Sequence, residues 1–231
     1  MINLDENKNV RCPQTGNILE QYKGIFDSVY IILNPFFYLN SIKDDQLNFY
    51  DFPDKSEILE KCNPISWNEI TNKLGIDNNV DLDFALRYYF HKDKHSHPEM
   101  KVAKDLRKLM DEERIMDPGK GEISPFIEDQ LLRVFNKIGY KKLYISDEFV
   151  TEQKLYDTKY LFNNDLIHVS GSLYPEDYKF LLTTNWENHC SYLCSSRSFI
   201  DEVLSMTDLE GFYATAEMEV WKEFEIIKSK I

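Results

Sequence analysis

YKFLLTTNWENHCSYLCSSRSFIDEVLSMTDLEGFYATAEMEVWKEF, residues 178–224, is the stretch that decides the fold class. Two runs rich in apolar residues, Tyr178–Thr183 and Cys190–Ser195, flank the polar segment Thr184–His189. This pattern predicts an antiparallel hairpin whose loop is longer than a tight turn. The stretch goes on to predict a short helix at Ser198–Met206, a strand at Gly211–Thr215 and a closing helix marked by Met218, Trp221, Phe224 and Ile227.

The helical period governs much of the chain before residue 140. Ser66 followed by Glu69 is a capping box, and Gly75 stands where a helix stops. Apolar spacing predicts an amphipathic helix at Asp81–His91. The strongest helix is predicted at Ser124–Ile138, between a Ser-Pro start and a glycine stop. Its inward stripe consists of Ile127, Leu131, Val134, Phe135 and Ile138.

Strands are predicted outside the opening stretch as well. Val29–Leu33 is a short β-branched run that ends at an Asn-Pro pair, and Lys142–Ser146 and Leu166–Ser170 also read as strands. The sequence therefore predicts an α+β fold. In that fold a helical N-terminal half packs on a mostly antiparallel sheet formed largely by the C-terminal half. We expect Val29–Leu33 to join this sheet from far away in the sequence.

The domain organisation follows from length and linker composition. The chain has 231 residues with only 8 glycines and 8 prolines, and no stretch resembles a flexible linker. We therefore predict a single domain over residues 1–231. Residues 56–139 form its mainly helical part and residues 140–231 its strand-rich α+β part.

The charge of the chain favours some partners over others. The formal net charge is -13, so the surface repels phosphate backbones and anionic membranes. We expect no nucleic-acid or membrane partner, and an acidic surface suits a basic protein partner. Aromatic residues reach 14%, which is too many for a disordered chain. The oligomeric state stays open at this point.

The cysteines and the chain start indicate a cytoplasmic protein. The first ten residues, MINLDENKNV, lack the basic start and apolar run of a signal peptide, and no apolar run is long enough to span a membrane. Reduced thiols are expected in that compartment. The four cysteines are Cys12, Cys62, Cys190 and Cys194.

The densest group of potential metal ligands is His91, His95 and His97. Two of these imidazoles share a helix face only if the helix runs through both, and Ser96 and Pro98 point to a break there. We interpret the group as a solvated loop and keep a metal site as the weaker alternative. No cofactor is expected.

No catalytic residue is assigned from the sequence. The Gly119-Lys120-Gly121 segment lacks both the earlier glycine and the following Ser or Thr of a phosphate-binding loop. The candidate binding site is instead the polar turn of the hairpin, with Trp186 as an aromatic anchor among Asn185, Glu187 and His189. The alternative function is an enzyme or small-molecule binder with a pocket near Trp186, His189 and His168.

Several of these segments together resemble an uncharacterised bacterial family, domain of unknown function 2711. The segments that carry the resemblance are Leu33-Asn34-Pro35-Phe36, Pro64-Ile65-Ser66-Trp67, Asp83-Phe84-Ala85-Leu86-Arg87, Tyr178–Trp186 and Leu209-Glu210-Gly211-Phe212. The resemblance covers most of the chain and implies no activity, substrate or catalytic residue. The tail is also similar in style to small acidic immunity proteins of bacterial toxin systems. Our interpretation is a non-catalytic binding protein, in its most specific form an immunity-like protein that blocks a basic toxin.

Overall fold

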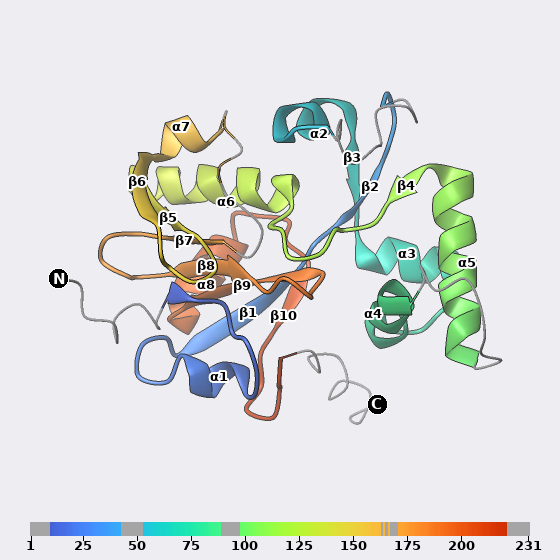
Figure 1. The fold of residues 1–231 in the computed structure, drawn as a ribbon, viewed down its shortest axis with the longest axis horizontal. Helices are drawn as coiled ribbons and strands as arrows, with labels where there is room; N and C mark the ends of the chain where they lie inside the picture. Colours follow the sequence, from blue (N-terminus) through green and yellow to red (C-terminus); the bar gives the residue numbers. More distant parts are fainter. Residues whose placement is uncertain are drawn as a thin grey trace. The chain divides into compact units, whose positions relative to one another are not determined.

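The chain forms the expected α+β fold in a computed structural model that describes residues 10–42, 53–88, 98–162, 164, 166 and 171–220 (Figure 1). The described residues make up two compact units. One contains residues 10–34 and 119–220 and the other lies within residues 35–118. Whether the two units make up a single domain over residues 1–231 depends on how they are joined, so the single domain stays a prediction.

The first unit is organised around an antiparallel sheet of seven strands in the order β10-β1-β9-β8-β7-β5-β6. The strands are β1 (Ser28–Leu33), β5 (Lys142–Ser146), β6 (Gln153–Asp157), β7 (Ser172–Tyr174), β8 (Leu181–Thr184), β9 (Cys190–Ser195) and β10 (Gly211–Tyr213). The β-branched run near residue 30 indeed joins the sheet from far along the sequence, because β1 lies between β9 and β10.

One face of this sheet carries the main core. Alternate strand residues such as Leu143, Leu182 and Leu193 are fully buried against helices α6 (Pro125–Lys137) and α8 (Arg197–Leu204). Phe180, just before β8, stacks on Phe135 of α6 with ring centroids 4.0 Å apart. Successive side chains of a strand point to opposite faces of the sheet, so the pairing register of the strands decides which alternate residues enter this core.

An N-terminal arm contacts the opposite face. This arm contains the short helix α1 (Ile18–Gln21), and the amide of Ile18 donates to the Met218 carbonyl at 3.1 Å. Tyr22, fully buried, interacts with the thiol of Cys194 on β9 and donates its hydroxyl to the Arg11 carbonyl at 2.8 Å. Helix α7 (Thr158–Phe162) follows β6.

The described residues of the second unit form four helices and a small sheet in the order β3-β2-β4. Ser66 caps α3 as expected, since its hydroxyl accepts the Glu69 amide at 3.0 Å, and Gly75 ends that helix in the left-handed region with φ 65°. Trp67 is fully buried and meets Phe36 edge to face. The elements of this second unit are β2 (Phe36–Tyr38), α2 (Lys55–Lys61), β3 (Asn63–Ile65), α3 (Trp67–Leu74), α4 (Asn79–Tyr88), α5 (Pro98–Glu113) and β4 (Ile115–Met116).

The structure shifts some of the predicted boundaries. The first hairpin strand begins at Leu181 rather than Tyr178, because Tyr178 takes a left-handed φ of 53° and its amide donates to the Pro175 carbonyl in a turn. Ile138 is half-buried rather than buried. Most of the strand predicted at Leu166–Ser170 and most of the closing helix lie outside the described residues.

Leu131 tests the packing of α6 on the sheet. Its side chain is fully buried, so Leu131→Ala is expected to lower the free energy of unfolding by about 2–5 kcal/mol in urea titrations. Lys137→Ala, at an exposed position of the same helix, is the control and should stay within about 0.5 kcal/mol of the parent protein. Equal effects of the two substitutions would contradict this packing.

Candidate functional site

The turn between β8 and β9 carries the residues that the sequence singles out. Asn185 shapes it, because its side-chain oxygen accepts the Glu187 amide at 3.0 Å and its carbonyl accepts the Asn188 amide at 3.0 Å. The Asn185 amide group also donates to the Pro13 carbonyl in the N-terminal arm at 2.9 Å. An asparagine that bonds to its own turn in this way fixes the backbone of that turn.

The loop before α6 supports the turn from behind. The Gly121 amide donates to the Asn188 carbonyl at 3.0 Å. His189 Nδ1 lies 2.7 Å from the Gly119 carbonyl, and since a carbonyl only accepts, that ring nitrogen carries the proton. Gly121 has φ +69°, and a Cβ there would lie 2.6 Å from the Cα of Trp186. Only glycine fits this approach of two backbones.

The end of β1 supplies the third support. The Asn34 backbone amide donates to the His189 carbonyl at 3.2 Å, and its side chain donates to the Glu122 carbonyl at 2.8 Å. Ser191 donates its hydroxyl to the side-chain oxygen of Asn34 at 2.9 Å. Three segments distant in sequence therefore meet under one turn.

The residues of the turn differ sharply in their exposed fraction. Asn185 and Asn188 have 0% exposure and His189 has 3%, whereas Trp186 is 50% exposed. Glu187 beside it is half-buried. The structure thus places the four predicted residues on one turn, with the indole presented outward on an anchored backbone.

His91, His95, His97 and His168 lie outside the described residues, so the metal alternative and the pocket alternative stay predictions. Within the described part of the chain, no three His, Cys, Asp or Glu side chains come together as a metal site. Within that same part, no helix is both long and apolar enough to cross a membrane.

All four cysteines are free and buried. Burial, and then the nearby Glu148 carboxylate, raises the pKa of Cys12 to about 12. Burial likewise raises the pKa of Cys194 far above its ordinary value. A thiol reacts as the thiolate, so these two cysteines are poor nucleophiles at neutral pH.

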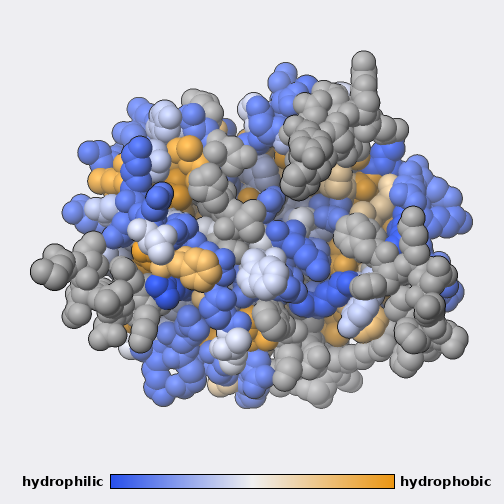
Figure 2. Space-filling view, in the orientation of Figure 1, coloured by the Kyte–Doolittle hydropathy of each residue, from blue (hydrophilic) through white to orange (hydrophobic). Residues whose placement is uncertain are grey.

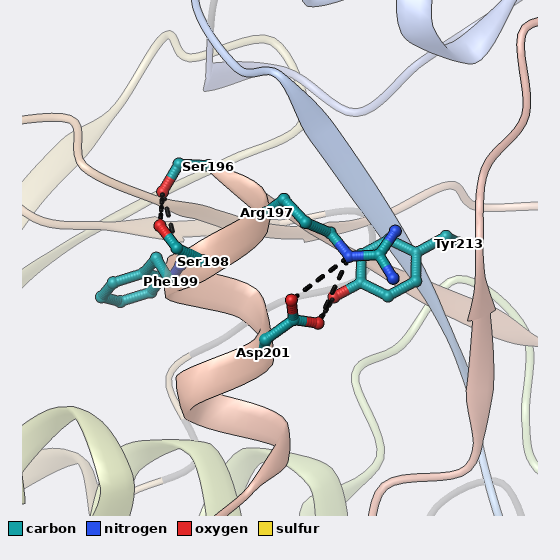
Figure 3. Close-up of polar contacts among 6 residues, drawn as sticks. All are labelled: Ser196, Arg197, Ser198, Phe199, Asp201 and Tyr213. Carbon is teal, nitrogen blue, oxygen red and sulfur yellow. Dashed lines mark hydrogen bonds and ion pairs between the residues drawn. The ribbon is translucent and has the colours of Figure 1, made fainter.

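A second polar cluster, missed by the sequence analysis, joins α8 to β10 (Figure 3). The Arg197 guanidinium lies 3.3 Å from the Tyr213 ring centroid, and its Nε lies 3.3 Å from Asp201 Oδ1. Tyr213 donates its hydroxyl to the same carboxylate at 2.6 Å. The ion pair has four-residue spacing and was detectable in the sequence, but the tyrosine comes from a separate element. Ser196 caps α8 by accepting the Phe199 amide.

A comparison with protein families finds a match over most of the chain. The model of a family described as a protein of unknown function, DUF2711, matches residues 14–223, a span that contains every described element from α1 to β10. No curated protein and no solved structure matches the chain.

Two glycines of one loop test the support of the turn. Gly119 and Gly121 share nearly the same left-handed φ, +68° and +69°, but a Cβ on Gly119 meets only Glu122 Oε2 at 3.8 Å. Gly119→Ala should therefore cost about 1–2 kcal/mol for the backbone conformation alone. Gly121→Ala should cost about 1–3 kcal/mol more, because it also forces the Trp186 backbone away. Equal losses in urea unfolding would contradict the close approach.

The Cys12 pKa makes stability depend on alkaline pH. The ordinary value is 9.0 and the folded value is about 12, so the unfolded chain releases this proton first. The stabilisation is complete below pH 9 and is lost as pH rises towards 12, at up to about 1.4 kcal/mol per pH unit. Urea titrations across this range should give a shallower decline for Cys12→Ala. A parallel decline in both proteins would contradict burial of the thiol.

Proposed function

The chain belongs to the DUF2711 family of proteins of unknown function, and we propose from its own surface that it acts by binding a basic protein through the Trp186 turn. The observation that carries the proposal is the contrast within this turn. Trp186 is half exposed, while the asparagines on either side of it are completely buried.

Pre-organisation is the physical reason for choosing this turn. A binding surface loses affinity when it must order loops and side chains on contact. Here the hydrogen bonds of Asn185, Asn188 and Gly121 already hold the backbone. Tryptophan is also among the side chains that most often dominate binding energy, since it offers a large apolar area with one polar group.

Charge supports a basic partner. Residues 171–220, which include the turn, contain nine acidic side chains and only two basic ones, Lys179 and Arg197. Hydrophilic residues cover most of the coloured surface in Figure 2, and hydrophobic ones show in small separate groups. The excess of acidic side chains in residues 171–220 steers cationic proteins in and repels nucleic acid. The acidic side chains are Glu176, Asp177, Glu187, Asp201, Glu202, Asp208, Glu210, Glu217 and Glu219.

The proposal has a more specific form. A small acidic protein with a rigid aromatic anchor suits the role of an immunity-like protein, which blocks a basic toxin in the bacterial cytoplasm. This form is motivated by the charge of the chain and by the similarity of its tail to such proteins. It requires that the basic partner be toxic when the protein is absent.

The test compares two aromatic positions of equal exposure. The basic protein recovered by pull-down is purified, and its dissociation constant is measured against the parent protein, Trp186→Ala and Tyr160→Ala. Trp186 and Tyr160 are 50% and 51% exposed, so each variant removes a similar exposed ring. Trp186→Ala should weaken binding by more than about 1 kcal/mol with stability nearly unchanged, and Tyr160→Ala should not weaken it.

The association rate supplies the second measurement. It should fall as salt rises, because the Debye length shrinks from about 10 Å at 0.1 M to about 3 Å at 1 M. Recovery of only acidic partners, or equal affinity of all three proteins, would contradict the proposal.

A further inference from the structure

The strand β6 ends the seven-stranded sheet on the side away from β10, among the strands that the structure describes (Figure 1). A strand in this position has one edge that pairs with no neighbour inside its sheet. Natural sheets usually protect such an edge, because it can accept a strand from another molecule. The chemistry of β6 therefore decides what its outer edge can bind.

The hydrogen bonds flanking β6 show which backbone groups face outward. The backbone amide of Asp147 donates to the Glu152 carbonyl at 3.2 Å, and the backbone amide of Thr158 donates to the Lys141 carbonyl at 2.9 Å. Antiparallel pairs alternate between bonded and non-bonded residues, so Lys154 and Tyr156 bond to β5. The remaining three residues, Gln153, Leu155 and Asp157, direct their amides and carbonyls to the free edge.

An apolar row leads to this edge across the sheet face that is opposite the main core. Leu155, which is 37% exposed, pairs with Tyr144 of β5, and Tyr144 pairs with Tyr174 of β7. The rings of Tyr144 and Tyr174 stack with centroids 5.6 Å apart, and Tyr178, 44% exposed, stacks on Tyr174 at the same distance. The row thus reaches the rim of the sheet with an exposed leucine.

The charge around β6 differs from the rest of the chain. Residues 137–159 contain five basic and four acidic side chains, whereas the whole chain carries -13. Two copies of this acidic protein repel each other at most orientations. Approach through the β6 region brings nearly neutral surfaces together, which makes a second copy a suitable occupant.

We propose that β6 is a self-association site, at which a second copy of the chain adds its own β6 in antiparallel orientation. A closed two-fold pair requires a residue to face its own equivalent, and Leu155 is the central residue whose backbone groups point outward. This register puts Gln153 opposite the carboxylate of Asp157 and Lys154 opposite Tyr156. Within one chain the Lys154 ammonium already lies 5.1 Å from the Tyr156 ring centroid.

The register gives the interface several favourable contacts. Leu155 exchanges two backbone hydrogen bonds with its equivalent, and the apolar rows of the two copies join into one. No like charges lie directly opposite each other along the five residues. This inference is independent of the basic partner proposed above, because it concerns the sheet edge opposite β10 and not the Trp186 turn.

Sedimentation velocity over a wide range of concentration tests the inference. The parent protein should shift from monomer to dimer as concentration rises. Leu155→Lys places two ammonium groups opposite each other. Leu155→Pro removes the leucine side chain and an outward amide while leaving the hydrogen bonds to β5 in place, so each substitution should weaken the dimer about tenfold or more. Ile25→Lys, at a residue of matching 38% exposure, is the control and should dimerise like the parent protein.

A second readout needs no substitution. In the parent protein, hydrogen exchange at the amides of Gln153, Leu155 and Asp157 should slow as concentration rises, whereas the amides of Lys154 and Tyr156 should be protected throughout. Circular dichroism checks that each variant remains folded. A parent protein that stays monomeric, a dimer that is unaffected by Leu155→Lys, or exchange that is independent of concentration would overturn the proposal.

Discussion

The buried amide side chains of Asn34, Asn185 and Asn188 are the constraint on which the region around the turn depends. All three have 0% exposure, and a buried amide group deprived of its partners costs about 1–3 kcal/mol. Their side-chain hydrogen bonds reach the Pro13 carbonyl, the loop before α6 and Tyr192 of β9. Displacement of any one of these segments would leave buried polar groups without a hydrogen-bond partner. The hydrogen bonds therefore fix the positions of the segments relative to one another.

This constraint explains why one side chain of the turn stands apart from its neighbours. The backbone of Trp186 is fixed by bonds on both sides and by the close approach of Gly121. The indole itself is half exposed, although a tryptophan left to itself gains by folding back over the sheet. A rigid backbone that holds an apolar ring in water is the arrangement expected of a binding anchor. In the function proposed above, the acidic side chains of residues 171–220 favour a basic partner.

The sequence predicts the regular elements well because their signals are local. The Ser66–Glu69 capping box, the apolar stripe of α6 and the apolar-rich run of β9 each appear in a short window, and each element forms where expected. The predicted start of β8 at Tyr178 is wrong, because Tyr178 adopts a left-handed conformation that a tyrosine does not predict. The small β2–β3–β4 sheet was missed because its strands are only two or three residues long.

The residues of the candidate site also fall into two groups, those predicted from local sequence and those brought together only by the fold. Trp186 and Asn185 were identified from the polar turn alone, since turn chemistry is local. The supporting groups were not found, because Pro13, Asn34 and Gly121 are far from the turn in sequence and meet it only in the fold. The contact between Arg197 and Tyr213 was not predicted for the same reason, since one residue lies on α8 and the other on β10.

The proposed binding role requires that the Trp186 turn be rigid in the free protein, and hydrogen exchange of its amides measures this rigidity most directly. The amides of Gly121, Glu187 and Asn188 each donate to a group within this network. All three amides should exchange slowly, with opening free energies near those of the β9 amides. Exchange at the rate of an unstructured loop, in a protein whose β9 amides remain protected, would contradict it.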